Sequence, residues 1–391
     1  MLYRKLGNTG EKVSILGFGC MRFPITNVND GSKIDKKQTF ELLNHSVENG
    51  INYFDTSFVY HNKVLFSKDG GTSETVLGEF FSQNYREDVL IADKLPVWNI
   101  KEEEDFNKYL NLQLKKLKTD YVDVFLIHSL NKVHWPKMYE LNVLNFLDEI
   151  KSDGRAKYVG FSFHDDLSIL YPIIKSYNWD IIQTQLNYLD ESYQAGVEGL
   201  KYINSKNIGT VIMEPLKGGK LVNNVPLKVQ DIFQKSEINR TFAWWAFKYL
   251  YNKTEVNTVL SGMSSLKELE ENISIASKSR PNTLSSNEKE IIQEVKEIYE
   301  SMRGIECGNC KYCMPCPYGV DIPKCFVWYN YLLMLSIDDK EEAKNHYLEF
   351  VEPKNRASNC TQCQKCIQLC PQDINIPHEL ETIKNTFEST T

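Results

Sequence analysis

Cysteine is nearly absent from most of this chain, since only Cys20 of the ten cysteines in 391 residues precedes Cys307. Small secreted proteins stapled by disulfides spread their cysteines through the whole chain, so that class is excluded. The chain also lacks any uninterrupted apolar stretch approaching about 18 residues, and its first residues contain no apolar segment like that of a signal peptide. These absences predict a cytoplasmic protein without a membrane span.

A surplus of positive charge is missing as well. Lysine and arginine together number 45 against 52 aspartates and glutamates, so the net charge is −7. Nucleic acids and anionic membranes attract basic surfaces, and neither is therefore an expected partner. Charged residues make up 25% and hydrophobic residues 42% of the chain, which is typical of a globular protein with a large core.

Through about its first 276 residues the chain alternates short apolar runs with longer amphipathic segments, which indicates strands followed by helices. Eight strand-like runs occur, at 14–18, 53–55, 89–94, 122–128, 156–162, 180–185, 209–213 and 258–261. This strict alternation predicts an α/β fold with a parallel sheet, and eight units are typical of a (β/α)8 TIM barrel. The alternative is an open doubly wound sheet, but the glycine-rich turn expected after its first strand is incomplete.

A polar stretch at residues 277–286, with Pro281 and several serines, indicates a linker after the barrel. Ser285 and Glu288 are spaced as a capping box, which predicts a helix running to about Met302. We therefore expect a barrel domain over residues 1–280. The segment 281–391 is expected to hold a linker helix and a smaller, mainly helical domain with the remaining cysteines.

Four polar residues follow consecutive strands of the predicted barrel. Asp55 ends the second strand, Tyr60 lies in the loop after it, Lys94 ends the third strand and His128 ends the fourth. Catalytic residues of such barrels sit at the carboxyl ends of the strands, which bring side chains from different strands together. A single buried Asp–Lys pair is often only structural, but four polar groups at neighbouring strand ends indicate a catalytic site.

The segment from Gly50 to Tyr60, which reads Gly-Ile-Asn-Tyr-Phe-Asp-Thr-Ser-Phe-Val-Tyr, resembles the signature of the aldo/keto reductase superfamily. Residues 3–19 are similar to the amino-terminal hairpin and first strand of that family, and the likeness extends over about residues 1–276. It implies a barrel oxidoreductase with a catalytic tetrad formed by Asp55, Tyr60, Lys94 and His128.

The chemistry that the resemblance implies suits these residue types. A carbonyl that accepts a hydride becomes an alkoxide and needs a proton, which Tyr60 would donate. The ordinary pKa of tyrosine, near 10, is high for this task, and Lys94 would lower it by stabilising the phenolate. Asp55 would hold Lys94, and His128 would orient the carbonyl.

The same resemblance implies a nicotinamide pocket. Ser162 and Gln183 match the residues that contact the nicotinamide carboxamide. Met213 stands where many members place an aromatic residue against the ring, and methionine can also pack against a ring. Leu216 lies in a loop, residues 215–221, that resembles the loop covering the pyrophosphate, whose N–H groups and lysines could meet phosphate. The alternative for this loop is an ordinary glycine turn.

Glu271 and Asn272 match the pair that contacts adenine in the family. The positions that bind a 2′-phosphate differ, because Gly262 stands where a lysine is common and Glu268 where an arginine is common. A 2′-phosphate facing a carboxylate is poorly held. The sequence therefore favours NAD(H) over NADP(H), while Lys267, beside Glu268, keeps the alternative open.

Eight cysteines form two runs near the carboxyl end: Cys307, Cys310, Cys313 and Cys316, then Cys360, Cys363, Cys366 and Cys370. The second run has the spacing C-x2-C-x2-C-x3-C-P of bacterial ferredoxins, and the first is one residue shorter before its last cysteine. Two such runs resemble a two-cluster ferredoxin, in which the cysteine before proline reaches over to the other cluster. The resemblance implies two 4Fe–4S clusters, one on Cys307, Cys310, Cys313 and Cys370, the other on Cys360, Cys363, Cys366 and Cys316.

Other metal arrangements remain open. Two C-x2-C pairs can make a zinc site with four cysteine ligands, and the short spacing before Cys316 also allows a single cluster or an altered ligand set. Cys325, at the start of a predicted helix, is expected to be a small buried residue rather than a ligand.

Taken together, the chain resembles the branch of the aldo/keto reductases with a ferredoxin-type domain. The favoured function is nicotinamide-dependent reduction of a small carbonyl compound to an alcohol, or the reverse, with clusters that are structural or regulatory. A ferredoxin-linked reductase is the alternative, in which the clusters pass single electrons to the substrate or to a flavin, although no flavin fingerprint is present. A redox sensor without turnover is a third possibility, which the intact tetrad disfavours.

Overall fold

The computed structural model describes residues 1–27, 30–62, 67–223, 225–236, 239–302, 304–305, 307, 311–334, 340–370 and 372–389. The chain forms two compact units. The first comprises residues 1–218 and 241–284, and the second comprises residues 219–240 and 285–391. The second unit thus includes a segment, residues 219–240, that the sequence analysis assigned to the barrel.

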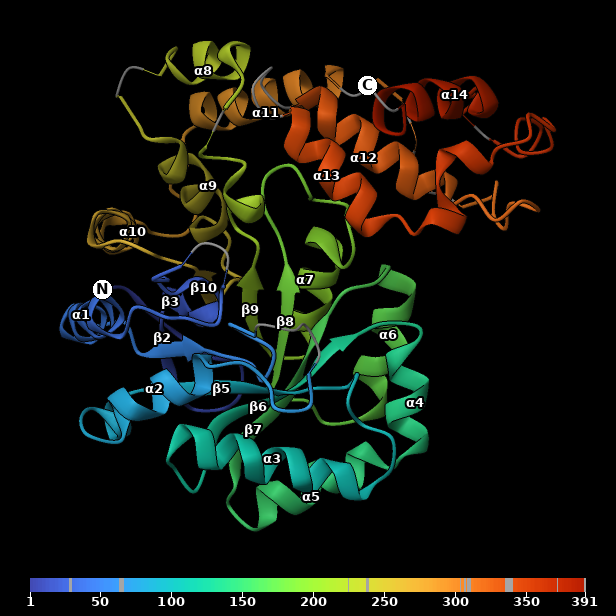
Figure 1. Ribbon diagram of the computed structural model, residues 1–391. Helices are drawn as coiled ribbons and strands as arrows, with labels where there is room; N and C mark the ends of the chain where they lie inside the picture. Colours follow the sequence, from blue (N-terminus) through green and yellow to red (C-terminus); the bar gives the residue numbers. More distant parts are fainter. Residues whose placement is uncertain are drawn as a thin grey trace. The chain divides into compact units, whose positions relative to one another are not determined.

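The first unit is a closed barrel of eight parallel strands, as the alternating pattern predicts (Figure 1). Each strand pairs with the strands before and after it, and the last, β10, closes the ring onto the first, β3. The barrel strands are β3 (Leu16–Gly19), β4 (Tyr53–Asp55), β5 (Leu90–Leu95), β6 (Val122–Leu130), β7 (Ala156–Phe163), β8 (Ile181–Gln185), β9 (Gly209–Met213) and β10 (Thr258–Ser261).

A short antiparallel hairpin precedes the barrel, formed by β1 (Tyr3–Lys5) and β2 (Lys12–Ser14). Leu6 and Val13 of this hairpin belong to a buried apolar cluster with inward-facing residues of the barrel strands, among them Tyr53 and Leu90. These partners lie at the beginnings of β4 and β5. The hairpin therefore packs at the amino end of the barrel and leaves the carboxyl ends of the strands for loops.

Helices follow the strands, because each connection between parallel neighbours needs a crossover. They are α1 (Lys36–Glu48), α2 (Ser73–Phe81), α3 (Glu104–Leu117), α4 (His134–Glu140), α5 (Val143–Ser152), α6 (Leu167–Ser176), α7 (Gly196–Ser205), α9 (Phe242–Tyr251) and α10 (Leu266–Lys278). The apolar residues of α3, such as Phe106 and Leu110, are buried, which is the amphipathic pattern expected of a helix on a barrel.

One predicted helix is in fact two. The periodicity predicts a single helix over residues 137–153, whereas the structure has α4 and α5 separated at Asn142. The backbone of Asn142 has φ 58°, in the left-handed region that interrupts a right-handed helix. Asparagine adopts this conformation more readily than most residues, so the break is local in origin.

The second unit contains α8 (Leu227–Phe233), α11 (Ser286–Ser301), α12 (Ile322–Met334), α13 (Lys340–Phe350) and α14 (Ile376–Phe387). The capping box that the sequence predicts is present, with Ser285 and Glu288 each accepting a backbone N–H of the other. Helix α8 packs against α11, and Lys235 pairs with Glu294 at 2.7 Å. These contacts explain why residues 219–240 belong to this unit.

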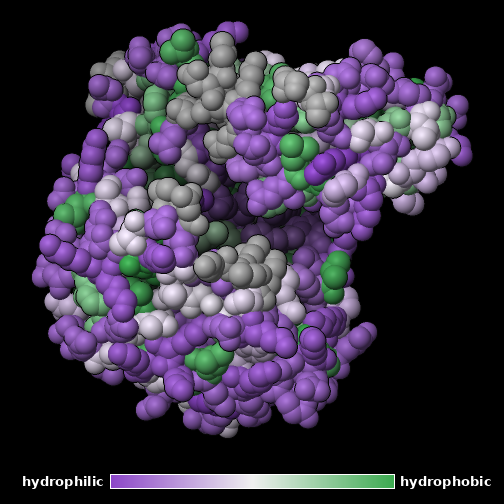
Figure 2. Space-filling view, viewed as in Figure 1, coloured by the Kyte–Doolittle hydropathy of each residue, from purple (hydrophilic) through white to green (hydrophobic). Residues whose placement is uncertain are grey.

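The surface is mostly hydrophilic on the face shown in Figure 2, with hydrophobic side chains scattered among polar ones. No helix in the described ranges is long and apolar enough to cross a membrane.

Gly160 on β7 lies too close to β8 to carry a side chain. A Cβ atom at this position would lie 1.9 Å from the Ile181 carbonyl oxygen. We expect Gly160→Ala to destabilise the barrel by about 3 kcal/mol, because the two strands would have to move apart. Urea unfolding followed by circular dichroism measures this. Gly31→Ala is the control, since nothing lies within 4 Å of a Cβ there. Equal unfolding midpoints for the two variants would contradict the prediction.

Candidate functional site

Lys94 and Asp55 form a buried ion pair at the carboxyl ends of β5 and β4. The ammonium Nζ lies 2.7 Å from Asp55 Oδ1 and donates to the Thr56 carbonyl oxygen at 2.6 Å. The exposed fractions of Lys94 and Asp55 are 1% and 2%. Burial alone lowers the pKa of Lys94, but Asp55 and the Tyr60 phenol outweigh that effect, so the pKa is raised and the side chain stays charged.

Tyr60 lies against the same ammonium. It follows β4 in a turn in which its N–H donates to the Ser57 carbonyl, and Gly71 packs so closely that a Cβ there would lie 1.8 Å from the Tyr60 carbonyl oxygen. Lys94 Nζ donates to the Tyr60 hydroxyl at 3.2 Å and lies 4.7 Å from the centre of the ring. The loop therefore holds the phenol over Lys94.

The pKa of Tyr60 differs from the sequence expectation. Lys94 does favour the phenolate, as expected, but burial favours the neutral phenol more strongly and raises the pKa of Tyr60 to about 12. The phenol is consequently protonated at neutral pH. This suits a residue that donates a proton rather than one that begins as a base.

His128 completes the group at the end of β6. Its ring meets the Tyr60 ring edge to face, with centroids 6.2 Å apart at 85°, and its Nδ1 lies 3.1 Å from the Ser57 hydroxyl. Trp98 packs on it with centroids 4.9 Å apart. Burial, assisted by Lys94, lowers the pKa of His128 well below its usual value, so the ring is neutral at pH 7. The structure thus brings together all four residues of the predicted tetrad.

A bulge in β6 connects this group to Ser162. The pairing between β6 and β7 shifts between Ile127 and Leu130, and Ser129 adopts φ 56° within the shift. Within the bulge the Ser129 N–H donates to the side-chain hydroxyl of Ser162, on the neighbouring strand β7, at 2.7 Å. Bulges of this kind redirect side chains near active sites.

Gln183 stands beside Ser162 in the register of β7 and β8 and is 1% exposed. Its amide nitrogen lies 3.8 Å from the Met213 sulfur. Its Oε1 is buried and has no hydrogen-bond donor among the described residues. A buried acceptor without a donor costs roughly 1–3 kcal/mol, so this atom is a candidate for a ligand's N–H group.

The residues assigned to the far end of the cofactor lie after β9 and β10. Asn272, buried on α10, donates to the Ser261 hydroxyl at 3.1 Å, and Glu271 beside it is half-buried. Gly262 follows Ser261 and is exposed, with the side chain of Arg22 across it. These residues occupy one corner of the barrel's carboxyl end.

The loop after β9 holds Leu216, which is half-buried, and Lys217. The side chain of Lys217 is ion-paired. Its Nζ lies 2.6 and 2.7 Å from the two carboxylate oxygens of Asp190. Asn187 also donates to this carboxylate, at 2.8 Å. The loop is thus tied to the segment after β8 by a salt bridge.

A second polar layer behind Lys94 was not foreseen from the sequence. Asp93 and Glu74 are fully buried and lie close enough for each carboxyl to shift the pKa of the other. Burial raises the pKa of both groups, and the Glu74 carboxylate raises that of Asp93 further. Gln113 donates to Glu74 and to the Lys94 carbonyl, and Lys116 pairs with Glu74 at 3.1 Å. The available signal was a carboxylate directly before Lys94 in an otherwise apolar strand.

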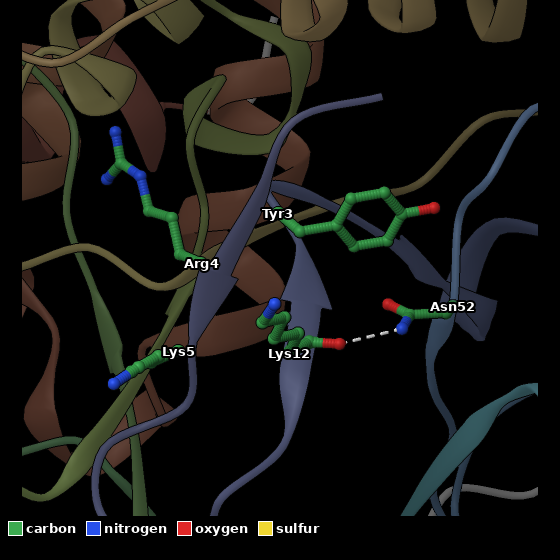
Figure 3. Close-up of a pocket in the computed structure, with 5 residues that line it drawn as sticks. All are labelled: Tyr3, Arg4, Lys5, Lys12 and Asn52. Carbon is green, nitrogen blue, oxygen red and sulfur yellow. Dashed lines mark hydrogen bonds between the residues drawn. The ribbon is translucent and has the colours of Figure 1, made fainter.

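A shallow hollow at the opposite, amino end of the barrel is lined by Tyr3, Arg4, Lys5, Lys12 and Asn52 (Figure 3). Asn52 donates to the Lys12 carbonyl at 2.9 Å, and the Arg4 guanidinium donates to the carbonyls of Tyr251, the last residue of α9, and Lys253. The polar groups of this hollow therefore hydrogen-bond the hairpin to neighbouring segments of the barrel. Because chemistry in such barrels occurs at the carboxyl ends of the strands, we place the functional site with the tetrad.

In the second unit, three of the predicted cluster cysteines line one small cavity. They are Cys307 and Cys313 from the first run and Cys370 from the second, together with Phe326 and Ile376. Cys310, the fourth residue expected in this set, lies outside the described residues. The cysteine before proline in the second run thus lies with the first run.

Cys360 and Cys366, from the second run, lie near Cys316 of the first run. The thiols of Cys360 and Cys366 interact electrostatically with that of Cys316 and with Cys363. Within the described ranges, no three His, Cys, Asp or Glu side chains converge as ligands of one metal ion.

Cys325 is apart from both groups. It is fully buried in the core of this unit, where its sulfur contacts the Tyr347 hydroxyl at 3.8 Å and the Asn355 carbonyl oxygen at 3.7 Å. Its packing agrees with a small buried residue.

Comparisons with known proteins match both parts of the chain. L-galactose dehydrogenase of Arabidopsis thaliana is 27% identical over 331 residues, which cover 77% of this chain and 95% of that protein. The oxidoreductase YqkF of Bacillus subtilis is 26% identical over 78% of this chain and its own full length. Among solved structures, the holo form of aldo-keto reductase AKR11C1 from Bacillus halodurans has a TM-score of 0.61 at 23% identity, covering 75% of this chain and 96% of that one.

Two family profiles account for nearly the whole chain. A profile for the aldo/keto reductase family matches residues 15–297, and one for a 4Fe–4S dicluster domain matches residues 306–375. The barrel, the clustered tetrad and the two cysteine groups lie within these ranges. This chain belongs to the aldo/keto reductase family, an oxidoreductase family, and carries in addition a ferredoxin-type 4Fe–4S domain.

Proposed function

We propose that this protein reduces a small carbonyl compound to an alcohol, or catalyses the reverse reaction, with a nicotinamide dinucleotide as the hydride carrier. The observation that carries the proposal is the contact of Lys94 with both Asp55 and Tyr60, beside a neutral His128. This group presents a protonated phenol and a fixed positive charge at one point, which is what a developing alkoxide requires.

Each residue has a distinct task in this proposal. Tyr60 gives its hydroxyl proton to the substrate oxygen, and the adjacent Lys94 stabilises the phenolate that remains. Asp55 keeps Lys94 charged and in place. His128 is neutral, and because Ser57 engages its Nδ1, the other ring nitrogen is available to orient the carbonyl oxygen.

The nicotinamide, when bound, supplies the hydride. Ser162 and Gln183 would hold its carboxamide, and the unpartnered Gln183 Oε1 suits the amide N–H of that group. Met213 would pack against the ring, Leu216 and Gly262 would lie along the dinucleotide, and Glu271 and Asn272 would contact the adenosine.

We propose NAD(H) in preference to NADP(H). The carboxylate of Glu268, in the first turn of α10, accepts from the N–H of Ser264, in the loop after β10, at 2.8 Å. A 2′-phosphate in this region would face that negative charge. The relative named as a sugar dehydrogenase agrees with the reverse direction of the same type of reaction.

For the second unit we propose two 4Fe–4S clusters. One would take Cys307, Cys310, Cys313 and Cys370, and the other would take Cys360, Cys363, Cys366 and Cys316. The cavity lined by cysteines of both runs supports this crossed arrangement, because ligands that are adjacent in sequence would not produce it.

The cysteine groups favour a second candidate function. A nicotinamide gives two electrons as a hydride, whereas an iron–sulfur cluster passes one. The clusters would then deliver electrons from a ferredoxin or another carrier to a flavin or substrate in the barrel. The experiments below distinguish this ferredoxin-linked reductase from the carbonyl reductase.

Tyr60→Phe is expected to lower kcat for NADH-dependent carbonyl reduction by about 10²–10⁴-fold, because the proton donor is lost while the ring remains. Calorimetry should show unchanged NADH affinity. Tyr85→Phe is the matched control, since the Tyr85 hydroxyl donates to Asn44 on the outer side of the barrel. Full carbonyl reduction by the Tyr60 variant would rule out its role as the acid.

The pH dependence follows from the pKa of Tyr60, which is about 12. Because the phenol stays protonated below that value, carbonyl reduction at saturating NADH should vary less than about twofold between pH 6 and 9. Alcohol oxidation needs the phenolate and should rise steadily with pH. Steady-state rates in both directions, in a buffer of constant ionic strength, test this. A fall in reduction with an apparent pKa near 7 would show that another group donates the proton.

Anaerobically purified protein should contain about eight iron atoms and about eight sulfides per chain, without zinc. Cys360→Ala combined with Cys366→Ala should lose about half of that iron, whereas Cys325→Ala should lose none. Stoichiometric zinc without sulfide would contradict the cluster proposal.

The same cysteine variant separates the two candidate functions. Carbonyl reduction by NADH that survives loss of the cluster supports the carbonyl reductase. Turnover that disappears while circular dichroism and NADH affinity are unchanged supports the ferredoxin-linked reductase.

A further inference from the structure

Arg22 follows the first barrel strand and extends across the loops after the last two. A Cβ atom on Gly262, in the loop after β10, would lie 3.0, 3.1 and 3.4 Å from Cβ, Cγ and Cδ of Arg22. A Cβ on Gly218, in the loop after β9, would lie 4.0 Å from the Arg22 Nη2. The aliphatic part of the side chain thus rests on Gly262, and the guanidinium reaches Gly218.

The guanidinium is exposed and makes no hydrogen bond or ion pair with the residues that the structure describes. The Glu214 carboxylate is nearby, with Oε2 3.9 Å from the same Cβ position on Gly218, but the two groups do not form an ion pair. An arginine placed by packing of its stem and left without a partner is suited to bind an anion, since its planar fork matches phosphate oxygens.

The position of Arg22 in the barrel also favours phosphate binding. β9 and β10 are the seventh and eighth strands of the barrel, and the loops after these two strands form the phosphate-binding site in many TIM-barrel enzymes. The two glycines allow a ligand to approach the backbone closely, because no side chain stands between them and Arg22.

Other groups of these loops that could bind phosphate are engaged by the protein. Lys217 is paired with both oxygens of Asp190. At the start of α10, Ser265 accepts from the Glu268 N–H, and Glu268 accepts from the Ser264 N–H. The helix end is therefore capped internally and offers fewer donors to a ligand. Of the described cations that lie against the two glycines, Arg22 is the one left to face an anion.

We propose that Arg22 is a phosphate-binding residue that holds the diphosphate of the dinucleotide between the loops after β9 and β10. This assignment rests on the nicotinamide-dependent function proposed above. A phosphate ester substrate would present the same chemistry to Arg22, and the experiment separates these two sources. The proposal also explains why residue 262 is glycine: a side chain there would displace the stem of Arg22.

The experiment is calorimetric titration of the full-length protein, purified anaerobically with its clusters. The probes are NADH, ADP-ribose, adenosine, inorganic pyrophosphate and glucose 6-phosphate. Arg22→Ala should weaken NADH and ADP-ribose binding about 10- to 100-fold, as expected for loss of a charge-assisted contact, and leave adenosine unchanged. The salt dependence of NADH binding should also decrease. Arg22→Gln, which keeps the stem on Gly262, should give the same loss.

Two further variants sharpen the test. Lys267→Ala removes an exposed cation of the same region that contacts neither glycine, and it should leave NADH affinity unchanged. Glu214→Gln removes the negative charge near Arg22 and should tighten NADH binding. Equal losses from the Arg22 and Lys267 variants would mean a general charge effect and would overturn the proposal.

The outcomes also separate this inference from the proposed function. Unchanged NADH affinity in both Arg22 variants would overturn the role of Arg22 and leave nicotinamide dependence intact. If wild-type protein bound no nucleotide but bound pyrophosphate or glucose 6-phosphate in an Arg22-dependent way, the phosphate site would stand and the nicotinamide proposal would fail. Absence of binding by every phosphate compound would overturn the inference.

Discussion

The buried contact between Lys94 and Asp55 is the interaction on which the rest of the site depends. Removing two charges from water costs several kcal/mol per ion, and the pair recovers this only through short, well-placed hydrogen bonds. The Lys94 ammonium makes three such contacts, to Asp55, to the Thr56 carbonyl and to Tyr60. These contacts join β4, β5 and the following loop at one point. Loss of either charge would leave the other buried without a partner. The ion pair therefore both holds the strand ends together and fixes the positive charge beside Tyr60.

The surroundings of this pair are polar on one side and aromatic on the other. Behind Lys94, Glu74 from α2 and Gln113 from α3 hydrogen-bond to each other, and Gln113 also donates to the Lys94 carbonyl, so both helices are connected to the strand that carries Lys94. The buried Asp93 lies beside Glu74, whose carboxylate raises the pKa of Asp93. In front, Trp98 and the Tyr60 ring enclose His128. A neutral histidine and a protonated tyrosine follow from this burial, because a low-dielectric environment disfavours a second charge beside Lys94.

In the second unit, each group of neighbouring cysteines contains residues from both cysteine runs of the sequence. Cys370 lies with the first run and Cys316 near the second, so folding of this unit brings the two runs together. The unit also takes α8 from the middle of the chain, which packs against α11. Its stability therefore depends on residues that precede the last strand of the barrel as well as on those that follow the barrel.

The sequence by itself predicted the eight-stranded barrel, which the structure confirms, and it singled out four polar residues that the structure brings together. These features could be predicted because they depend on residues that are close together in the sequence, such as the alternation of apolar and polar residues and the polar residues that end each strand. It did not reveal the surroundings of Glu74 and Arg22, because each side chain lies against residues that are far away in the chain and are brought near only by folding. The direction of the Tyr60 pKa shift was also decided by tertiary structure. The sequence indicated that Lys94 would lower the pKa of Tyr60. Burial of the phenol raises that pKa more strongly, and the degree of burial depends on all the residues that pack around the ring.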